Sequence, residues 1–236
     1  MKQFIVNPSY WDLFPDAVIN ILVLEGIDNH YQGNEAEYEA LLKEGGKAAQ
    51  AHLTEDTFSQ NPAVAIWREA FKTFKTKKGA RSSIEALLKR ISQGHEFSPI
   101  IPLVDIYNYA SLKYGVPVGG EDIDKMAGDI HLGTAQGGEA FLPLGSEEDA
   151  PALEGEVIYY DSEGAICRCL NWREAQRTML TEDTTNAFII VDNASSQQAE
   201  AAGQAIAEIQ ALAEKLLGVK GKIQTLTKEN PQADLM

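Results

Sequence analysis

Four short segments between Gly128 and Val191 decide the fold: DIHLGTA (129–135), EAFLPL (139–144), EVIYYD (156–161) and AICRCLN (165–171). Each is short and either apolar throughout or alternately apolar and polar, which is typical of β-strands. The sequence DSEG at 161–164 predicts a hairpin turn between the last two segments. We therefore expect a β-sandwich-like core from Gly128 to Val191.

Helical periodicity flanks this core on both sides. Apolar residues recur at helical spacing in five segments, at 35–52, 63–74, 83–94, 103–114 and 196–217. The pair Gly45-Gly46 should break or kink the first of these helices. Two strands, 1–6 and 17–25, are expected before it. The last expected element ends at 217, and in the C-terminal tail at 219–236 the residues 227–236 have the composition of a disordered segment. The chain is thus predicted to be α+β, with helices packed on a β-sandwich in β/β/α layers.

The composition limits the kinds of protein that this chain can be. With 236 residues, 44% of them hydrophobic, it can bury one sizeable core. The first residues lack the long apolar run of a signal peptide, and no run approaches a membrane span, so we expect a cytoplasmic protein with no membrane partner. Two cysteines and four scattered histidines show no zinc-type spacing, so we expect no metal and no cofactor.

Charge is unevenly distributed along the chain. The formal net charge is −15, which disfavours strong sequence-independent binding to nucleic acid, and we expect no DNA partner. Eight basic and two acidic residues nevertheless lie between Arg68 and Arg90, a local net charge of 8 − 2 = +6. This strip is either a solvated helix-and-turn surface or a docking surface for an RNA backbone. On the second interpretation, the RNA-binding residues are Lys75, Lys77, Lys78 and Arg81.

Two polar residues fall on the inward face of the helix expected at 103–114. Asp105 and Asn108 are three positions apart and share their face with Leu112. Polar side chains in such a place need partners. They either form a buried hydrogen-bond network that positions the loop 115–120 or line the wall of a pocket.

A second polar cluster lies at and just beyond the strand expected at 165–171. Arginine forks bind carboxylates and phosphates at modest desolvation cost, so this strand end suits an anionic ligand, although a solvated surface has the same composition. Cys167 and Cys169, two apart on this strand, should face the same way, and without a nearby histidine they are poor candidates for a catalytic dyad. The candidate ligand-binding residues are Arg168, Asn171, Arg173, Gln176 and Thr178.

Taken together, these pieces resemble the B3/B4 module of the phenylalanyl-tRNA synthetase β subunit, and the freestanding members of that family most closely. The resemblance rests on the order and spacing of five pieces: RSSIEALLKR (81–90), PLVDIYNYASLKYGVPVGGEDIDK (102–125), GGE (137–139), CRCLNWREAQRT (167–178) and TEDTTNAFIIV (181–191). It divides the chain into a B3/B4-like domain at 81–218, an N-terminal extension of strands and helices at 1–80 and the tail at 219–236.

The resemblance implies hydrolysis of mischarged aminoacyl-tRNA, because that module edits wrongly charged tRNA. Such an ester is already activated, so a positioned water, oxyanion donors and a selective pocket suffice, with no serine or cysteine nucleophile. Asn108 matches an asparagine of the family's editing site. The chain departs from the family pattern at Gly119, where a histidine is usual, and at Gln176, which aligns near a substrate-reading glutamate. Tyrosine specificity is therefore not carried over.

Glu139 and Glu174 are the nearest candidate general bases, although either would equally serve as a salt-bridge partner of Arg168 or Arg173. We expect Asp105, Asn108, Glu139, Arg168, Asn171 and Arg173 to line one cleft, with Gly119 also contacting substrate. Three functions compete: a freestanding deacylase of mischarged aminoacyl-tRNA, a non-catalytic binding module for tRNA, an amino acid or a nucleotide, and an enzyme acting on an unrelated small molecule. The expected partners are tRNA, bound weakly through residues 68–90, and an aminoacyl or other small ligand.

Overall fold

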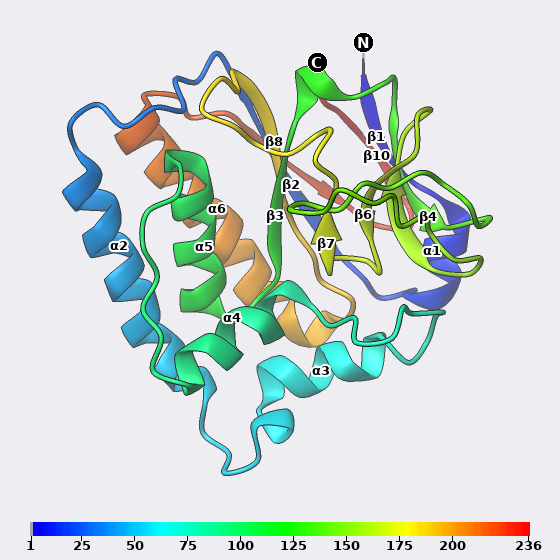
Figure 1. Cartoon of the computed structure of the whole chain (residues 1–236), viewed down its shortest axis with the longest axis horizontal. Helices are drawn as coiled ribbons and strands as arrows, with labels where there is room; N and C mark the ends of the chain where they lie inside the picture. Colours follow the sequence, from blue (N-terminus) through cyan, green and yellow to red (C-terminus); the bar gives the residue numbers. More distant parts are fainter. Residues whose placement is uncertain (1) are drawn as a thin grey trace.

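The computed structural model describes residues 2–236, which form two β-sheets covered by a layer of helices (Figure 1). The first sheet has the strand order β10-β1-β4-β5-β6-β7 and the second the order β3-β8-β2-β9. All strand pairs are antiparallel except β1 with β4. The strands are β1 (Gln3–Val6), β2 (Ile19–Glu25), β3 (Val118–Asp122), β4 (Ile130–Thr134), β5 (Val157–Tyr160), β6 (Ala165–Arg168), β7 (Arg173–Glu174), β8 (Asn186–Val191), β9 (Lys222–Leu226) and β10 (Gln232–Asp234).

The four-stranded sheet is the middle layer, which explains why its central strands are apolar throughout. On β8, Phe188 and Ile190 face the six-stranded sheet, whereas Ile189 and Val191 face the helices. A strand buried on both faces has no polar alternation, as the run in β2 also shows. The predicted α+β class and β/β/α layering are confirmed.

Three long helices lie side by side on the outer side of the middle sheet in Figure 1; the last two contact its strands, and the first packs against the second. They are α2 (Glu35–Ala48), α5 (Pro102–Tyr114) and α6 (Ala199–Leu217). The shorter helices are α1 (Pro8–Leu13), α3 (Pro62–Ala70) and α4 (Ser83–Ser92). Ser82 caps α4 by accepting a hydrogen bond from the Glu85 amide, which satisfies one free N–H of its first turn.

The double glycine does not break α2, contrary to our expectation. The helix continues through Gly45 to Ala48 and ends in a 3₁₀ turn, Ala49–His52. A Cβ on Gly45 would come within 3.3 Å of the Tyr109 Cα. The missing side chain therefore lets α2 and α5 approach closely, and this packing offsets the low helix propensity of glycine.

Three other predictions are wrong. The β-sandwich is not confined to residues 128–191, because β1, β2 and β3 precede this range in the chain and β9 and β10 follow it. Residues 219–236 are ordered, because β9 pairs with β2 and β10 pairs with β1. The segment 139–144 is not a strand and makes only an isolated bridge, between Pro143 and Ala175. The last two errors have the same cause. An edge strand and an extended loop that covers a core have similar sequence patterns, and only their hydrogen-bonding partners in the folded protein distinguish them.

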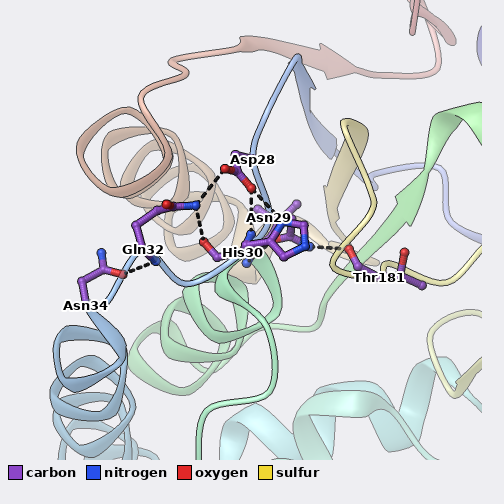
Figure 2. A network of polar contacts seen from close by, with 7 residues as sticks. Asp28, Asn29, His30, Gln32, Asn34 and Thr181 are labelled. Atoms are coloured by element: carbon purple, nitrogen blue, oxygen red, sulfur yellow. Dashed lines mark hydrogen bonds and ion pairs between the residues drawn. The ribbon is translucent and has the colours of Figure 1, made fainter.

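The loop after β2 ties this sheet to the helices (Figure 2). Asn29 is fully buried; its side chain donates to the Thr181 carbonyl at 2.8 Å and accepts from the Leu103 amide at 2.9 Å. Asp28 accepts from Gln32 at 2.8 Å and contacts the His30 ring. The loop thus fixes the first turn of α5 against the segment that enters β8.

Candidate functional site

A cavity of about 360 Å³ opens where the edge strands of the two sheets meet. Strand β3 is the edge of the middle sheet and β7 the edge of the six-stranded sheet. Ser83 lies on the rim at the start of α4. Apolar side chains make up much of the wall: Val118, Leu144, Tyr159, Cys167, Leu170, Phe188 and Ile190.

Gly119 keeps this space open. On β3, residues 119 and 121 share the face of Ile190 and Phe188, their cross-strand partners on β8. A Cβ on Gly119 would lie 3.8 Å from Ile190 and 4.0 Å from the Glu174 carboxylate, so a small side chain fits but would enter the cavity. Gly120 faces the helices instead, where a Cβ would lie 2.6 Å from Ile189.

Two glutamates line the cavity from opposite sheets. Glu121 on β3 is 5% exposed, and its Oε2 has no hydrogen-bond partner among residues 2–236. Burial and the nearby Glu174 hold the pKa of Glu121 well above its ordinary value. Burial likewise raises the pKa of Glu174 to about 7. One proton is therefore favoured on the pair near neutral pH.

A third carboxyl group is tied into the wall. Asp192 accepts hydrogen bonds from the Tyr159 hydroxyl and from the Asn171 side-chain amide, the latter at 2.9 Å. Burial raises its pKa to about 6, and the two hydrogen bonds act in the opposite direction. Asn171 also accepts from the Ser83 amide at 3.4 Å, so it connects α4 to the wall. Asp192 thus supports the site and keeps Asn171 oriented.

The mouth of the cavity is aromatic and basic. Trp172 lies on the rim, with the Arg173 guanidinium 5.4 Å and the Lys77 ammonium 5.7 Å from the centre of its ring. Both are within range of a cation–π interaction. The exposed Lys75, Lys77, Lys78 and Arg81 occupy the segment between α3 and α4, which leads directly to Ser83.

Of the residues expected to contact substrate or act in catalysis, Gly119, Asn171, Arg173 and Glu174 line the cavity. The six residues expected in one cleft are not brought together there, because only Asn171 and Arg173 of that set lie on its wall. Asp105 accepts hydrogen bonds from the Tyr31 hydroxyl and the Ile100 amide, so it fixes loops beside α5 rather than loop 115–120. Asn108 is half-buried on α5, outside the cavity lining.

Arg168 is buried in an ion pair with Glu156 and does not line the cavity. Its guanidinium forms two hydrogen bonds to the Glu156 carboxylate, at 2.5 and 2.7 Å, and both side chains are at most 2% exposed. A third bond, to the Ala150 carbonyl, anchors the loop before β5. The partner of Arg168 is thus Glu156, in place of the expected Glu139 or Glu174, and the arginine is held away from the cavity.

The remaining candidates hold loops in place. Gln176 donates to the carbonyls of Pro143 and Ser146 at 2.8 and 2.6 Å. Glu139 accepts the backbone amides of residues 136 and 137. Thr178 is buried beside β3 and outside the cavity lining; its carbonyl accepts the Asp122 amide at 2.9 Å, and its hydroxyl lies near the Glu121 carboxyl, whose pKa it lowers in part.

Cys169 and Leu170 do not continue the strand that was expected at 165–171. Strand β6 ends at Arg168, and Cys169 and Leu170 follow with φ of 47° and 63°. Cys169 therefore turns away from the face of Cys167, and its sulfur accepts the Lys77 amide at 3.4 Å. The left-handed backbone at two non-glycine residues directs Asn171 and Trp172 to the cavity.

Sequence reasoning missed Glu121, Asp192 and Trp172. Glu121 follows two glycines, which is typical of a loop, although its two-residue spacing from Gly119 places both on one face of a strand. Among residues 2–236, no group of three or more histidine, cysteine or acidic side chains is arranged to hold a metal ion. No helix in this range has the length and apolar character needed to cross a membrane.

The model of the B3/4 domain matches residues 66–215, which include α4, β3, β7, β8 and every residue of the cavity wall. The chain belongs to the B3/4 domain family. It is 32% identical over 110 residues to the phenylalanine–tRNA ligase beta subunit of Ruegeria pomeroyi, covering 46% of this chain and 13% of that protein. It is 31% identical over 94 residues to the beta subunit of Fusobacterium nucleatum, covering 40% of this chain and 12% of that one.

This B3/4 domain protein therefore spans about an eighth of the length of the curated relatives that it matches. Among solved structures, an N-terminal fragment of the phenylalanyl-tRNA synthetase beta subunit from Pyrococcus horikoshii is similar with a TM-score of 0.45 and 18% identity. That similarity covers 93% of this chain and 49% of the fragment.

Proposed function

We propose that this B3/4 domain protein hydrolyses the ester bond of mischarged aminoacyl-tRNA, with the cavity between β3 and β7 as its active site. The observation that carries the proposal is the position of Glu174, a carboxyl group on the wall of an otherwise largely apolar cavity, where burial raises its pKa to about 7. A general base is most effective when its pKa lies near the working pH. The kinship with beta subunits of phenylalanine–tRNA ligase supports tRNA as the partner.

In the proposed reaction, Glu174 takes a proton from a water molecule that attacks the ester carbonyl. The carbon–oxygen bond to the ribose then breaks, and the leaving ribose oxygen takes the proton. The developing oxyanion needs a donor, and Ser83 is suited to this role. It lines the cavity in the first turn of α4, and its Oγ is buried without a hydrogen-bond partner among the described residues. The positive end of the α4 dipole adds to the effect.

The exposed basic segment Lys75–Arg81 would hold the phosphates of the acceptor end, because it leads from the surface to the rim of the cavity. Contacts of this kind supply affinity without reading sequence. The strip lies within a chain of net charge −15, so the proposed binding is weak and sensitive to salt.

Deacylation of a panel of mischarged tRNAs tests the proposal. The wild-type protein should release the amino acid from at least one member, and Glu174→Gln should slow the release by about 10²- to 10⁴-fold, the usual contribution of a general base. Asn108→Ala and Glu182→Gln are matched controls outside the cavity and should act like the wild type. Binding of aminoacyl-tRNA without deacylation would instead support a non-catalytic binding module.

A further inference from the structure

The polar part of the cavity wall is acidic, and one of its oxygens has no partner. The side chains of Glu121, Glu174 and Asp192 all line the space. Asp192 is satisfied by Tyr159 and Asn171, but Oε2 of the buried Glu121 forms no hydrogen bond of normal length and angle within residues 2–236. The buried Thr178 hydroxyl, also unpaired by these criteria, is the neutral donor nearest to this carboxyl and lowers its pKa in part. A buried carboxyl oxygen without a partner costs free energy, so a ligand that supplies a donor there gains affinity.

We propose that Glu121 receives the free α-ammonium group of the bound amino acid, so that the pocket takes aminoacyl esters with an unblocked amine and rejects N-acylated ones. This assignment rests on the proposed function, since it names the substrate class of the same cavity. The apolar wall, including Tyr159, Phe188 and Ile190, is left for the amino-acid side chain.

The charged groups around Glu121 support a cationic ligand group. Glu174 faces it from β7, Asp122 follows it on β3, and both add negative potential. Arg177 partly offsets this charge, but its guanidinium is paired with Asp161 at 2.7 Å. Arg173 is exposed at the mouth. An ammonium group is therefore attracted to the interior, whereas the carboxylate of a free amino acid is repelled there.

Binding of an ammonium group should also release the proton that the two glutamates hold near neutral pH. A cation beside Glu121 favours its ionised form and that of Glu174. Glu174 is then the free carboxylate that a general base must be. In this arrangement, a substrate with a free ammonium group causes the glutamate pair to lose its proton, so that Glu174 can act as the base. A ligand without that group leaves the proton on the pair.

Isothermal titration calorimetry with amino-acid amides tests the assignment, because an amide has the shape of the ester and is not readily hydrolysed. The amides of phenylalanine, tyrosine, leucine and methionine are each compared with their N-acetyl forms and with the free amino acids at about pH 6.5, where the amines are charged. At least one amide should bind about 10- to 100-fold more tightly than its N-acetyl form and its free acid. Titrations in buffers of different ionisation enthalpy should show net release of protons.

Glu121→Gln preserves the size of the side chain, and two readouts distinguish its effect from a folding defect. Affinity for the amide should fall by about 10- to 100-fold, while affinity for the N-acetyl form is unchanged or improved, and proton release should disappear. Glu182→Gln, which changes an exposed acid outside the cavity, should behave as wild type. Equal binding of amide and N-acetyl amide, the same loss for both in Glu121→Gln, or no binding of any amide at millimolar concentration overturns the assignment.

The binding experiment tests the role of Glu121 separately from the proposed hydrolysis. If mischarged tRNA is deacylated regardless of N-acetylation, the proposed function stands and the role of Glu121 fails. If amides bind as expected but no tRNA is deacylated, the role of Glu121 stands and the hydrolase fails.

Discussion

Glu121 and Glu174 line one cavity from the edge strands of two different sheets. They are 53 positions apart in the chain (174 − 121) and come together because β3 and β7 are the corresponding edges of the sandwich. Burial raises the pKa of both carboxyl groups, and the charge of Glu174 raises that of Glu121 further. This relationship gives the cavity both a candidate base and a candidate cation receptor.

The pair should make stability depend on pH. A carboxyl group whose pKa is raised in the folded state holds its proton more tightly there than in the unfolded chain. Each glutamate therefore lowers the free energy of unfolding as the pH rises from 4.5, the ordinary pKa, to the pKa of the folded state, and has no further effect above it. Glu121→Gln removes this penalty and should stabilise the protein by about 1–3 kcal/mol at about pH 8 and hardly at all near pH 4.5. Urea denaturation at both pH values measures the difference. A stabilisation that is equal at the two pH values would contradict the raised pKa.

Neighbouring glycines on β3 should respond differently to substitution. Gly119→Leu places a side chain in the cavity, where a Cβ has room, so ligand binding and deacylation should be lost while the melting temperature changes little. Gly120→Ala should cost about 1–3 kcal/mol, because its Cβ would lie 2.6 Å from Ile189 on the packed side of the sheet. Thermal melts and ligand titration of both variants separate the two effects. Loss of stability in Gly119→Leu equal to that in Gly120→Ala would place the cavity elsewhere.

Arg168 should contribute to the free energy of unfolding and not to ligand binding. Arg168→Met leaves Glu156 buried without its partner and should destabilise the protein by about 3–5 kcal/mol. The double variant Arg168→Met with Glu156→Met removes both charges and should recover much of this stability. Chemical denaturation of these variants and of Glu156→Met completes the cycle. An unchanged stability of Arg168→Met, together with weaker ligand binding, would make Arg168 a binding residue instead.

The basic segment should govern the salt dependence of tRNA binding. Reversal of Lys75, Lys77 and Lys78 to glutamate should weaken binding and reduce the slope of log affinity against log salt by up to about 0.9 for each phosphate that is no longer neutralised. Reversal of Lys215, Lys220 and Lys222, also exposed, changes the net charge equally and is the control. Filter binding at several salt concentrations, with circular dichroism for folding, gives the comparison. The same effect from both triple variants would mean that net charge alone matters.

The local pattern determined much of the fold. Periodicities of two and 3.6 residues placed all the long helices and five of the ten strands in residues 2–236, namely β1, β2, β4, β5 and β6. They could do so because the pattern of apolar side chains along an element depends on which of its faces is buried. The continuously apolar run of β2 agrees with the place of this strand in the middle sheet, where both of its faces are covered. Where a strand is short and lies at an edge, as in β9 and β10, the pattern is too weak to distinguish it from a disordered tail.

The site was determined by the sequence only in part. Asn171, Arg173 and Glu174 were visible as polar residues at the end of an apolar strand, and they line the cavity. Arg168 has the same local appearance, but it is buried against Glu156, a partner 12 positions away that no spacing rule selects. Glu121 was missed because its raised pKa depends partly on the charge of Glu174, and Glu174 belongs to the other sheet. Residue chemistry and periodicity are local properties and are visible in the sequence. Which carboxyl groups share a cavity, and hence which of them keep a proton at neutral pH, depends on the pairing of sheet edges, which only the tertiary structure decided.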